Sequence, residues 1–243
     1  MLAAFRWLLL GVFVVLFGIG GCLFCILRPF HRNNTFIWAR VFGWATRILG
    51  LKLRVKVHSD VPNGGPYVYI CNHQNSWEIF TIAATLPPNT VTVGKKSLRW
   101  IPFFGWLYWL AGNILIDRKN KGKAHGTIAQ TATAIKKRDI SVWMFPEGTR
   151  SNGRGLLPFK NGAFHTAFQA GVDIVPVCVS NLHDKIKMNR WDNGELRVEF
   201  LQPVKIANFR KETLRDLSKQ CHQQMAHKIA ELDKPQQSEK ENA

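Results

Sequence analysis

A chain of 243 residues can hold one domain of ordinary size plus an appendage, or two small domains, and it can bury a full hydrophobic core. Its net charge of +17 points to anionic partners, although composition does not separate phosphate-bearing substrates from acidic lipid surfaces or nucleic acid. The five cysteines are odd in number and mostly embedded in apolar runs, so they predict neither a disulfide framework nor a zinc site.

The first long apolar run, Trp7 to Leu27, contains 21 residues without a charge and is flanked by Arg6 and Arg28. As a helix it would measure about 31 Å, enough to cross the core of a bilayer. Four glycines weaken it as a straight helix, so a kinked, re-entrant or interfacial placement stays open beside a spanning one. The apolar run continues past Cys22, and the region before it holds only Arg6, which predicts an uncleaved anchor. Positive charge falls mostly after the run, which predicts that the following domain lies on the cytoplasmic side.

The next segment, Thr35 to Leu51, has apolar residues at helical spacing and two arginines a heptad apart on another face. It is predicted to lie as an amphipathic helix on the membrane surface, or to pack on the soluble domain. The aromatic-rich run Ser97 to Leu110 suits the headgroup boundary, an acyl-chain pocket or an ordinary buried helix. We therefore expect a membrane region at 1–52, a soluble domain at 53–233 and a disordered polar tail at 234–243.

From Arg54 onward, short apolar runs alternate with runs of helical periodicity. This alternation predicts a single α/β domain with a mixed or parallel sheet flanked by helices, preceded by the membrane-anchoring region. The predicted strands are Arg54 to His58, Tyr67 to Cys71, Val91 to Gly94, Asn113 to Asp117, Ser141 to Phe145, Ile174 to Ser180 and Leu196 to Leu201. The predicted helices are Ser76 to Thr85, Ser97 to Leu110, Lys123 to Lys137, Gly162 to Ala170 and Lys211 to Leu232.

Ligand sites in such sheets gather at the carboxyl ends of strands. Four residues with functional side chains each follow a predicted strand closely: His73, Lys95, Arg118 and Glu147. We expect them to converge on one rim of the sheet.

The pair His73 and Glu78 is the first candidate for chemistry. Five positions turn a regular helix by about 500°, which separates the two side chains by about 140°, so His73 is predicted to lie in a turn before a helix that starts near Asn75 or Ser76. Glu78 in the first helical turn can then reach back to the imidazole and fix its tautomer, leaving the other ring nitrogen free to take a proton from a hydroxyl. The pair alone is a weak signal.

Two loops carry further candidates. The segment Asp117 to Lys123 concentrates four cations, of which Arg118 follows an apolar run and can clamp a phosphate with its planar guanidinium. The turn Phe145 to Ser151 presents a carboxylate, a hydroxyl, backbone N–H groups and one guanidinium together, which suits a polyol phosphate. The alternative is a structural turn closed by an ion pair between Glu147 and Arg150.

In their order along the chain, these segments resemble the motif blocks of the glycerolipid acyltransferase family, and most closely its bacterial branch that acts on 1-acyl-sn-glycerol-3-phosphate. The resemblance is strong from about Val68 to Val179 and looser over the whole chain. The matching segments are Asn72-His73 with Glu78, Gly94 to Leu98, Gly112 to Arg118, Phe145 to Ser151 and Val175 to Val177.

The resemblance implies transfer of a fatty acyl group from acyl-CoA or acyl carrier protein to the sn-2 hydroxyl of lysophosphatidic acid, giving phosphatidic acid in phospholipid biosynthesis at the bacterial inner membrane. It implies no metal and no cofactor beyond the acyl donor. The site residues that it implies are His73 as general base, Glu78 as its partner, Lys95, Arg118 and Arg150 as phosphate binders, and Glu147, Gly148 and Thr149 as the acceptor pocket. The family usually has Asp where this chain has Glu78, and the extra methylene moves the carboxylate by about 1.5 Å.

Two alternatives stay open at this point. The acceptor can be glycerol-3-phosphate or another lysophospholipid. The chain can also be a basic membrane protein without enzymatic activity that binds acidic lipid or nucleic acid, although no nucleic-acid-binding signature is present.

Overall fold

The computed structural model describes residues 1–61, 65–116 and 124–235. A seven-stranded mixed sheet forms its centre, with strand order β1-β7-β6-β2-β5-β3-β4, so the predicted fold class is confirmed. Strands β6, β2, β5, β3 and β4 run parallel, whereas β7 is antiparallel to β6 and parallel to β1. Each predicted strand is present: β1 Lys52–Val57, β2 Val68–Cys71, β3 Thr90–Lys95, β4 Ile114–Ile116, β5 Ser141–Met144, β6 Ile174–Val179 and β7 Glu195–Phe200. Asp117, at the end of the predicted fourth strand, lies outside the described residues.

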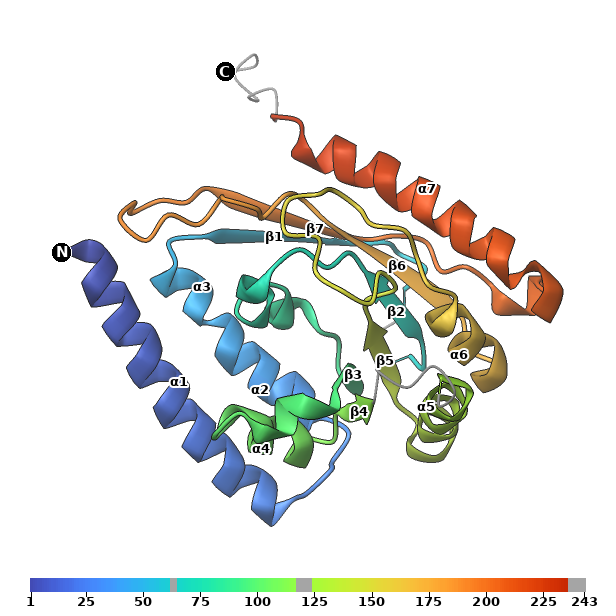
Figure 1. Cartoon of the computed structure of the whole chain (residues 1–243), viewed down its shortest axis with the longest axis horizontal. Helices are drawn as coiled ribbons and strands as arrows, with labels where there is room; N and C mark the ends of the chain where they lie inside the picture. Colours follow the sequence, from blue (N-terminus) through green and yellow to red (C-terminus); the bar gives the residue numbers. More distant parts are fainter. Residues whose placement is uncertain (62–64, 117–123, 236–243) are drawn as a thin grey trace.

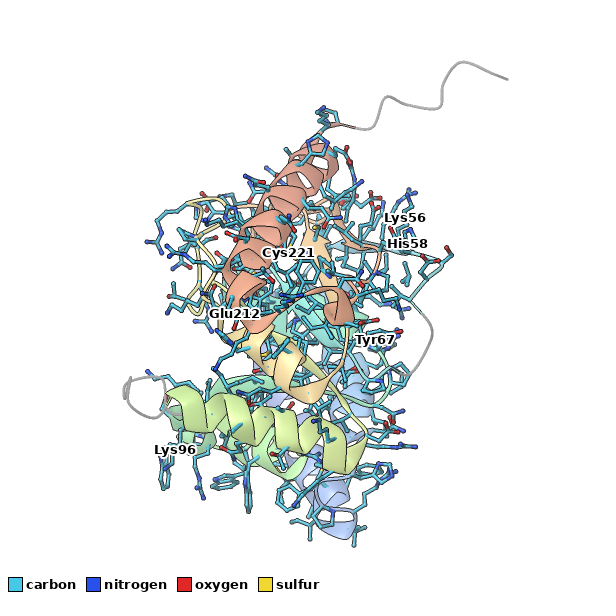
Figure 2. The ribbon with its side chains drawn as sticks, turned by 90° about the vertical axis from the view of Figure 1, so that its right-hand side faces the viewer. Lys56, His58, Tyr67, Lys96, Glu212 and Cys221 are labelled. Carbon is cyan, nitrogen blue, oxygen red and sulfur yellow. The ribbon has the colours of Figure 1, made fainter. Side chains whose placement is uncertain are left out.

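Helices cover both faces of this sheet (Figure 1). Because side chains alternate along a strand, Val68 and Ile70 of β2 enter one core while Tyr69 and Cys71 enter the other. The first core is closed by α5 Ala124–Arg138, α6 Gly162–Ala170 and α7 Leu214–Asp233, which form the face viewed in Figure 2. The second is closed by α1 Leu2–Leu27, α2 Asn34–Gly43, α3 Ala45–Ile48 and α4 Phe104–Leu110.

Two of the predicted helices are broken where side chains compete for backbone groups. The predicted helix Ser76 to Thr85 is two 3₁₀ helices, η1 Ser76–Ile79 and η2 Ile82–Thr85. The hydroxyls of Thr81 and Thr85 donate to backbone carbonyls at 3.2 Å and 2.7 Å, which competes with a continuous helical ladder. In the same way the Thr46 hydroxyl donates to the Gly43 carbonyl at 2.7 Å, where α2 gives way to α3.

The predicted helix Ser97 to Leu110 is also interrupted. It consists of the 3₁₀ helix η3 Lys96–Trp100 followed by α4. Pro102 lacks a backbone N–H, and Phe103 has a positive φ of 58°, so the helix cannot run through them. The predicted helix Lys211 to Leu232 begins with the 3₁₀ turn η6 Lys211–Thr213, and its α-helical part, α7, starts at Leu214.

Helix α1 packs along the domain rather than standing apart from it. Among the described residues it is the one helix long and apolar enough to cross a membrane. Its N-terminal end is bound through Arg6, and just past its C-terminal end the Phe30 N–H donates to the Leu110 carbonyl at 2.9 Å. An inward stripe at helical spacing faces the domain: Arg6, Leu10, Phe13, Gly18, Gly21 and Cys25. The other side of α1 is exposed and apolar.

Candidate active site

The site lies at the carboxyl ends of β2, β5 and β3, as predicted for this sheet. The pairing Ile70 with Met144 and Thr92 with Trp143 puts Asn72, Pro146 and Lys95 at one level of the rim. Since β3 and β2 are two strands apart, the backbone of Lys95 lies about 10 Å from that of the histidine loop. The predicted phosphate binder Arg118 and the basic loop Asp117 to Lys123 lie outside the described residues.

His73 stands in the turn between β2 and η1, with Asn75 as the N-cap of η1, as the sequence predicted. Its Nδ1 is hydrogen-bonded to Oε2 of Glu78, and its ring stacks on Phe145 with the ring centroids 4.0 Å apart. Glu78 is 6% exposed, and its other oxygen, Oε1, accepts the backbone N–H of Gln74. Among the described residues no hydrogen bond is made by the opposite ring nitrogen, Nε2. The carboxylate therefore holds the imidazole in one orientation and leaves Nε2 for a substrate.

Glu147 lies beneath the histidine rather than on the surface of the turn. It is 3% exposed, and its two oxygens accept the backbone N–H groups of His73 at 2.6 Å and Leu157 at 2.9 Å. Burial raises the pKa of Glu147, against the lowering effect of these two N–H groups. It makes no ion pair with Arg150, although the structure describes both side chains. The alternative reading of this turn as one closed by that ion pair is thus wrong.

The backbone of the histidine loop is also fixed from the loop after β5. The N–H of Ser151 donates to the His73 carbonyl at 2.8 Å, and that of Asn152 donates to the Gln74 carbonyl at 2.9 Å. Together with the bond from His73 N–H to Glu147, both backbone groups of His73 are used. The position of the imidazole is therefore set by two loops that are distant in sequence.

Two amide side chains beside the histidine were given no role by the sequence. Asn72 exchanges two hydrogen bonds with the backbone of Val179, at 3.0 Å and 2.9 Å. Gln74 donates to the Ser180 carbonyl at 2.8 Å and accepts the Leu182 N–H at 2.7 Å. The signal was available, since both are polar residues directly after a buried strand, where an unpaired amide would be costly.

The turn after β5 exposes two of its polar side chains to solvent. Gly148 has a positive φ of 70°, while Thr149 and Arg150 are exposed. The backbone carbonyls of Arg150 and Ser151 accept from the guanidinium of Arg154 at 3.0 Å and 2.8 Å, which stiffens the turn. Lys160 was also missed by the sequence analysis: a Cβ on Gly148 would lie 2.8 Å from its Nζ. The turn therefore gathers cations beside the histidine.

The side-chain groups near the site limit the chemistry available. All five cysteines are free, and burial raises the pKa of the Cys71 thiol well above its ordinary value, so this thiol is a poor nucleophile. Within the described ranges no group of three His, Cys, Asp or Glu side chains could hold a metal ion. The arrangement pairs a histidine with a buried carboxylate, which is chemically able to act as a base and its orienter.

Comparison with known proteins identifies close relatives along nearly the whole chain. The family model described as Acyltransferase matches residues 52–180. The chain is 50% identical over 234 residues to the 1-acyl-sn-glycerol-3-phosphate acyltransferase of Salmonella typhimurium, which covers 96% of each protein. The protein of the same name from Escherichia coli K12 is 49% identical over 234 residues, again with 96% of each chain covered.

A solved structure shares the fold. It is the 1-acyl-sn-glycerophosphate (LPA) acyltransferase PlsC from Thermotoga maritima, which superimposes with a TM-score of 0.74. The match covers 94% of this chain and 95% of the other, at 22% sequence identity.

Proposed function

The chain belongs to the acyltransferase family, and from this premise we propose that it transfers a fatty acyl group to the sn-2 hydroxyl of 1-acyl-sn-glycerol-3-phosphate, forming phosphatidic acid for phospholipid biosynthesis. The acceptor is supported by the names of relatives about half identical over nearly the full chain. The acyl donor is a thioester, either acyl-CoA or acyl carrier protein, and no other cofactor takes part. The observation that carries the proposal is the bond between His73 Nδ1 and the buried carboxylate of Glu78.

In the proposed mechanism His73 is the general base and the acyl group passes directly to the acceptor. The Nδ1–H group stays hydrogen-bonded to the Glu78 carboxylate. Nε2 removes the proton of the sn-2 hydroxyl as that oxygen attacks the thioester carbonyl. Backbone N–H groups near the turns stabilise the tetrahedral oxyanion. When the C–S bond breaks, the thiolate takes the proton from the imidazolium and leaves as a free thiol. No covalent acyl-enzyme forms, and Glu78 stabilises the transient positive charge.

The phosphate of the acceptor is bound by cations at the same rim. Lys95 and Arg150 are exposed at the ends of β3 and of the turn after β5, and among the described carboxylates neither has an ion-pair partner. Arg118 is proposed as a third phosphate binder on the motif alone. Gly148 and Thr149 line the acceptor pocket, and the buried Glu147 shapes it from below through the backbone of His73.

We infer that α1 binds the membrane along its exposed side rather than crossing it. A helix of 26 residues measures about 39 Å, longer than the bilayer core of about 30 Å, yet both of its ends are bonded to one domain. Exposed tryptophans continue its apolar side, and Arg99 lies over two of them, at 5.3 Å from the Trp100 ring and 5.6 Å from the Trp109 ring. Such pairs suit the headgroup region of an anionic lipid surface. The predicted location is the cytoplasmic side of the bacterial inner membrane.

One experiment tests the reaction and the acceptor together. Purified protein is given labelled acyl-CoA, and in a parallel assay labelled acyl carrier protein, with lysophosphatidic acid, glycerol-3-phosphate and lysophosphatidylcholine in competition. We expect label chiefly in phosphatidic acid, formed at least about a hundredfold more slowly with His73→Ala. Preferred acylation of either other acceptor would replace the proposed substrate, and absence of transfer from both acyl-CoA and acyl carrier protein would reject the activity.

A further inference from the structure

Arg6 is a buried cation without a carboxylate partner among the described residues. It is 3% exposed and lies near the start of a helix that is otherwise apolar. Its guanidinium donates instead to backbone carbonyls of one loop, those of Lys187, Met188, Arg190 and Trp191. Burying an unpaired charge is costly, so the guanidinium is held only because these carbonyl dipoles replace water.

The same loop is fitted closely around Arg6. A Cβ on Gly50 would lie 2.7 Å from Nη2 of Arg6 and 2.0 Å from the Trp191 carbonyl oxygen, so only glycine permits this approach. Asn193 fastens the loop to the end of α3, with its N–H bonded to the Gly50 carbonyl at 2.7 Å and its side chain to the Leu49 carbonyl at 2.7 Å. Arg6 is therefore one component of a built contact.

The other end of this segment, residues 180–194, holds the histidine loop. The Gln74 side chain bonds the backbone of Ser180 and Leu182, and the side chain of Asn75 donates to the Leu182 carbonyl at 3.3 Å. Between these ends the segment borders a polar cavity of about 510 Å³ that reaches the C-terminal end of α7. Inside the segment, Leu182 packs in the second core, and the Asn181 N–H donates to Asp233 at 2.6 Å across the cavity. Because the cavity replaces packed core on this side, the Arg6 and Asn193 contacts carry much of the support at the end near α1.

We propose that Arg6 is a positioning residue for acyl transfer, which acts through segment 180–194 on Gln74 and thereby on His73. Segment 180–194 then supports both α1, the helix proposed to contact the membrane, and the loop that carries His73. The inference rests on the proposed function for its effect on turnover, but not for its effect on the structure. Misplacing a reacting group by about 1 Å can cost about a hundredfold in rate, so a small shift of the segment is enough.

The test compares two substitutions that remove one positive charge from opposite ends of α1. Arg6→Met removes the four-carbonyl contact, whereas Arg28→Met, the control, removes a side chain that stacks on Phe24 and bonds His31. In vesicles of phosphatidylcholine and phosphatidylglycerol, we expect Arg6→Met to lower kcat about ten- to a hundredfold with KM for lysophosphatidic acid within about twofold. Arg28→Met should stay within about twofold in both. Arg6→Lys keeps the charge without the planar fork and should recover only part of kcat.

A second measurement does not depend on turnover. Hydrogen exchange at the backbone N–H groups of Leu182 and Ser151 should accelerate in Arg6→Met and not in Arg28→Met, while the amides of β2 and β5 stay protected in both. Protection in these strands also reports that the variant is folded, and flotation of the vesicles reports that it is still bound. Unchanged exchange at Leu182, or a kcat for Arg6→Met equal to that of Arg28→Met, would overturn the proposal. If the wild-type protein transfers no acyl group, the proposed function fails while the exchange comparison still decides the coupling.

Discussion

Replacing Glu78 by Gln should abolish most of the activity although the two side chains have the same shape. In the native site Oε1 of Glu78 accepts the backbone N–H of Gln74 and also faces that of Asn75 at 3.4 Å. In the variant the N–H groups of Gln74 and Asn75 still need an acceptor, so the amide oxygen of the new Gln side chain must take the place of Oε1. The amide NH₂ must then face Nδ1 of His73.

The consequence is a reversed tautomer. Nδ1 becomes a hydrogen-bond acceptor, so the ring proton moves to Nε2, which can no longer remove a proton from a hydroxyl. Reversing the tautomer in a base and carboxylate pair of this kind costs about 10³- to 10⁴-fold in kcat. This loss corresponds to about 4 to 5.5 kcal/mol of activation free energy.

The assay measures kcat and KM for Glu78→Gln with labelled acyl-CoA and lysophosphatidic acid, beside Glu78→Asp and the unfolding midpoint of each variant. KM should be almost unchanged, because Glu78 does not touch the acceptor phosphate in the proposed mechanism. Glu78→Asp keeps the charge but shortens the reach by about 1.5 Å, so it should retain far more activity than Glu78→Gln. A kcat for Glu78→Gln above about a tenth of the native value, with normal folding, would refute the assigned roles of the pair.

Four other substitutions test the site. His73→Ala should lower kcat at least about a hundredfold in a variant that still folds, and unchanged turnover would remove the base assignment. Arg150→Ala should raise KM for lysophosphatidic acid with little change in kcat; an unaltered acceptor dependence would exclude it from the phosphate site. Gly148→Ala forces a positive φ of 70° on a residue with a Cβ and pushes against Lys160, so urea unfolding should detect a loss of about 1–2 kcal/mol. Burial raises the pKa of Glu147, so the native protein should lose stability relative to Glu147→Gln as the pH rises through that raised pKa. If the difference in unfolding free energy between the two proteins stayed constant from about pH 4 to pH 8, this expectation would be wrong.

The strands were predictable from the sequence because each is a short apolar run with clear ends. The helices after β2 and β3 were not, because their breaks depend on local groups that periodicity does not register. Thr81 and Thr85 bond backbone carbonyls through their hydroxyls, and Pro102 has no N–H to give. In each case the hydrophobic pattern placed the apolar residues correctly, but local hydrogen bonding interrupted the helix.

The histidine and its carboxylate were predictable for a local reason. Asn75 is a good N-cap, and an acid three positions later can reach back over the turn. The position of Glu147 was not predictable, because its partners are the backbone N–H groups of His73 and Leu157, 74 and 10 positions away. In sequence, a carboxylate next to an arginine in a turn predicts an ion pair. In the fold, the packing of the Glu147 turn against the backbone of His73 and Leu157 directs the carboxylate inward.

Helix α1 shows why hydropathy alone could not separate crossing the membrane from lying along it. In the proposed arrangement one side of the helix faces lipid and the other faces protein, and both environments accept apolar residues. The sequence of α1 therefore lacks the polar stripe that marks an ordinary surface helix. Glycine lowers the intrinsic stability of a straight helix, but on the inward side of α1 it allows α4 to pack closely. A Cβ on Gly21 would lie 2.8 Å from the Leu107 side chain. The single informative residue was Arg6. As a flanking charge of a spanning helix it belongs in the headgroup region, whereas its burial against four carbonyls requires protein at that end of the helix.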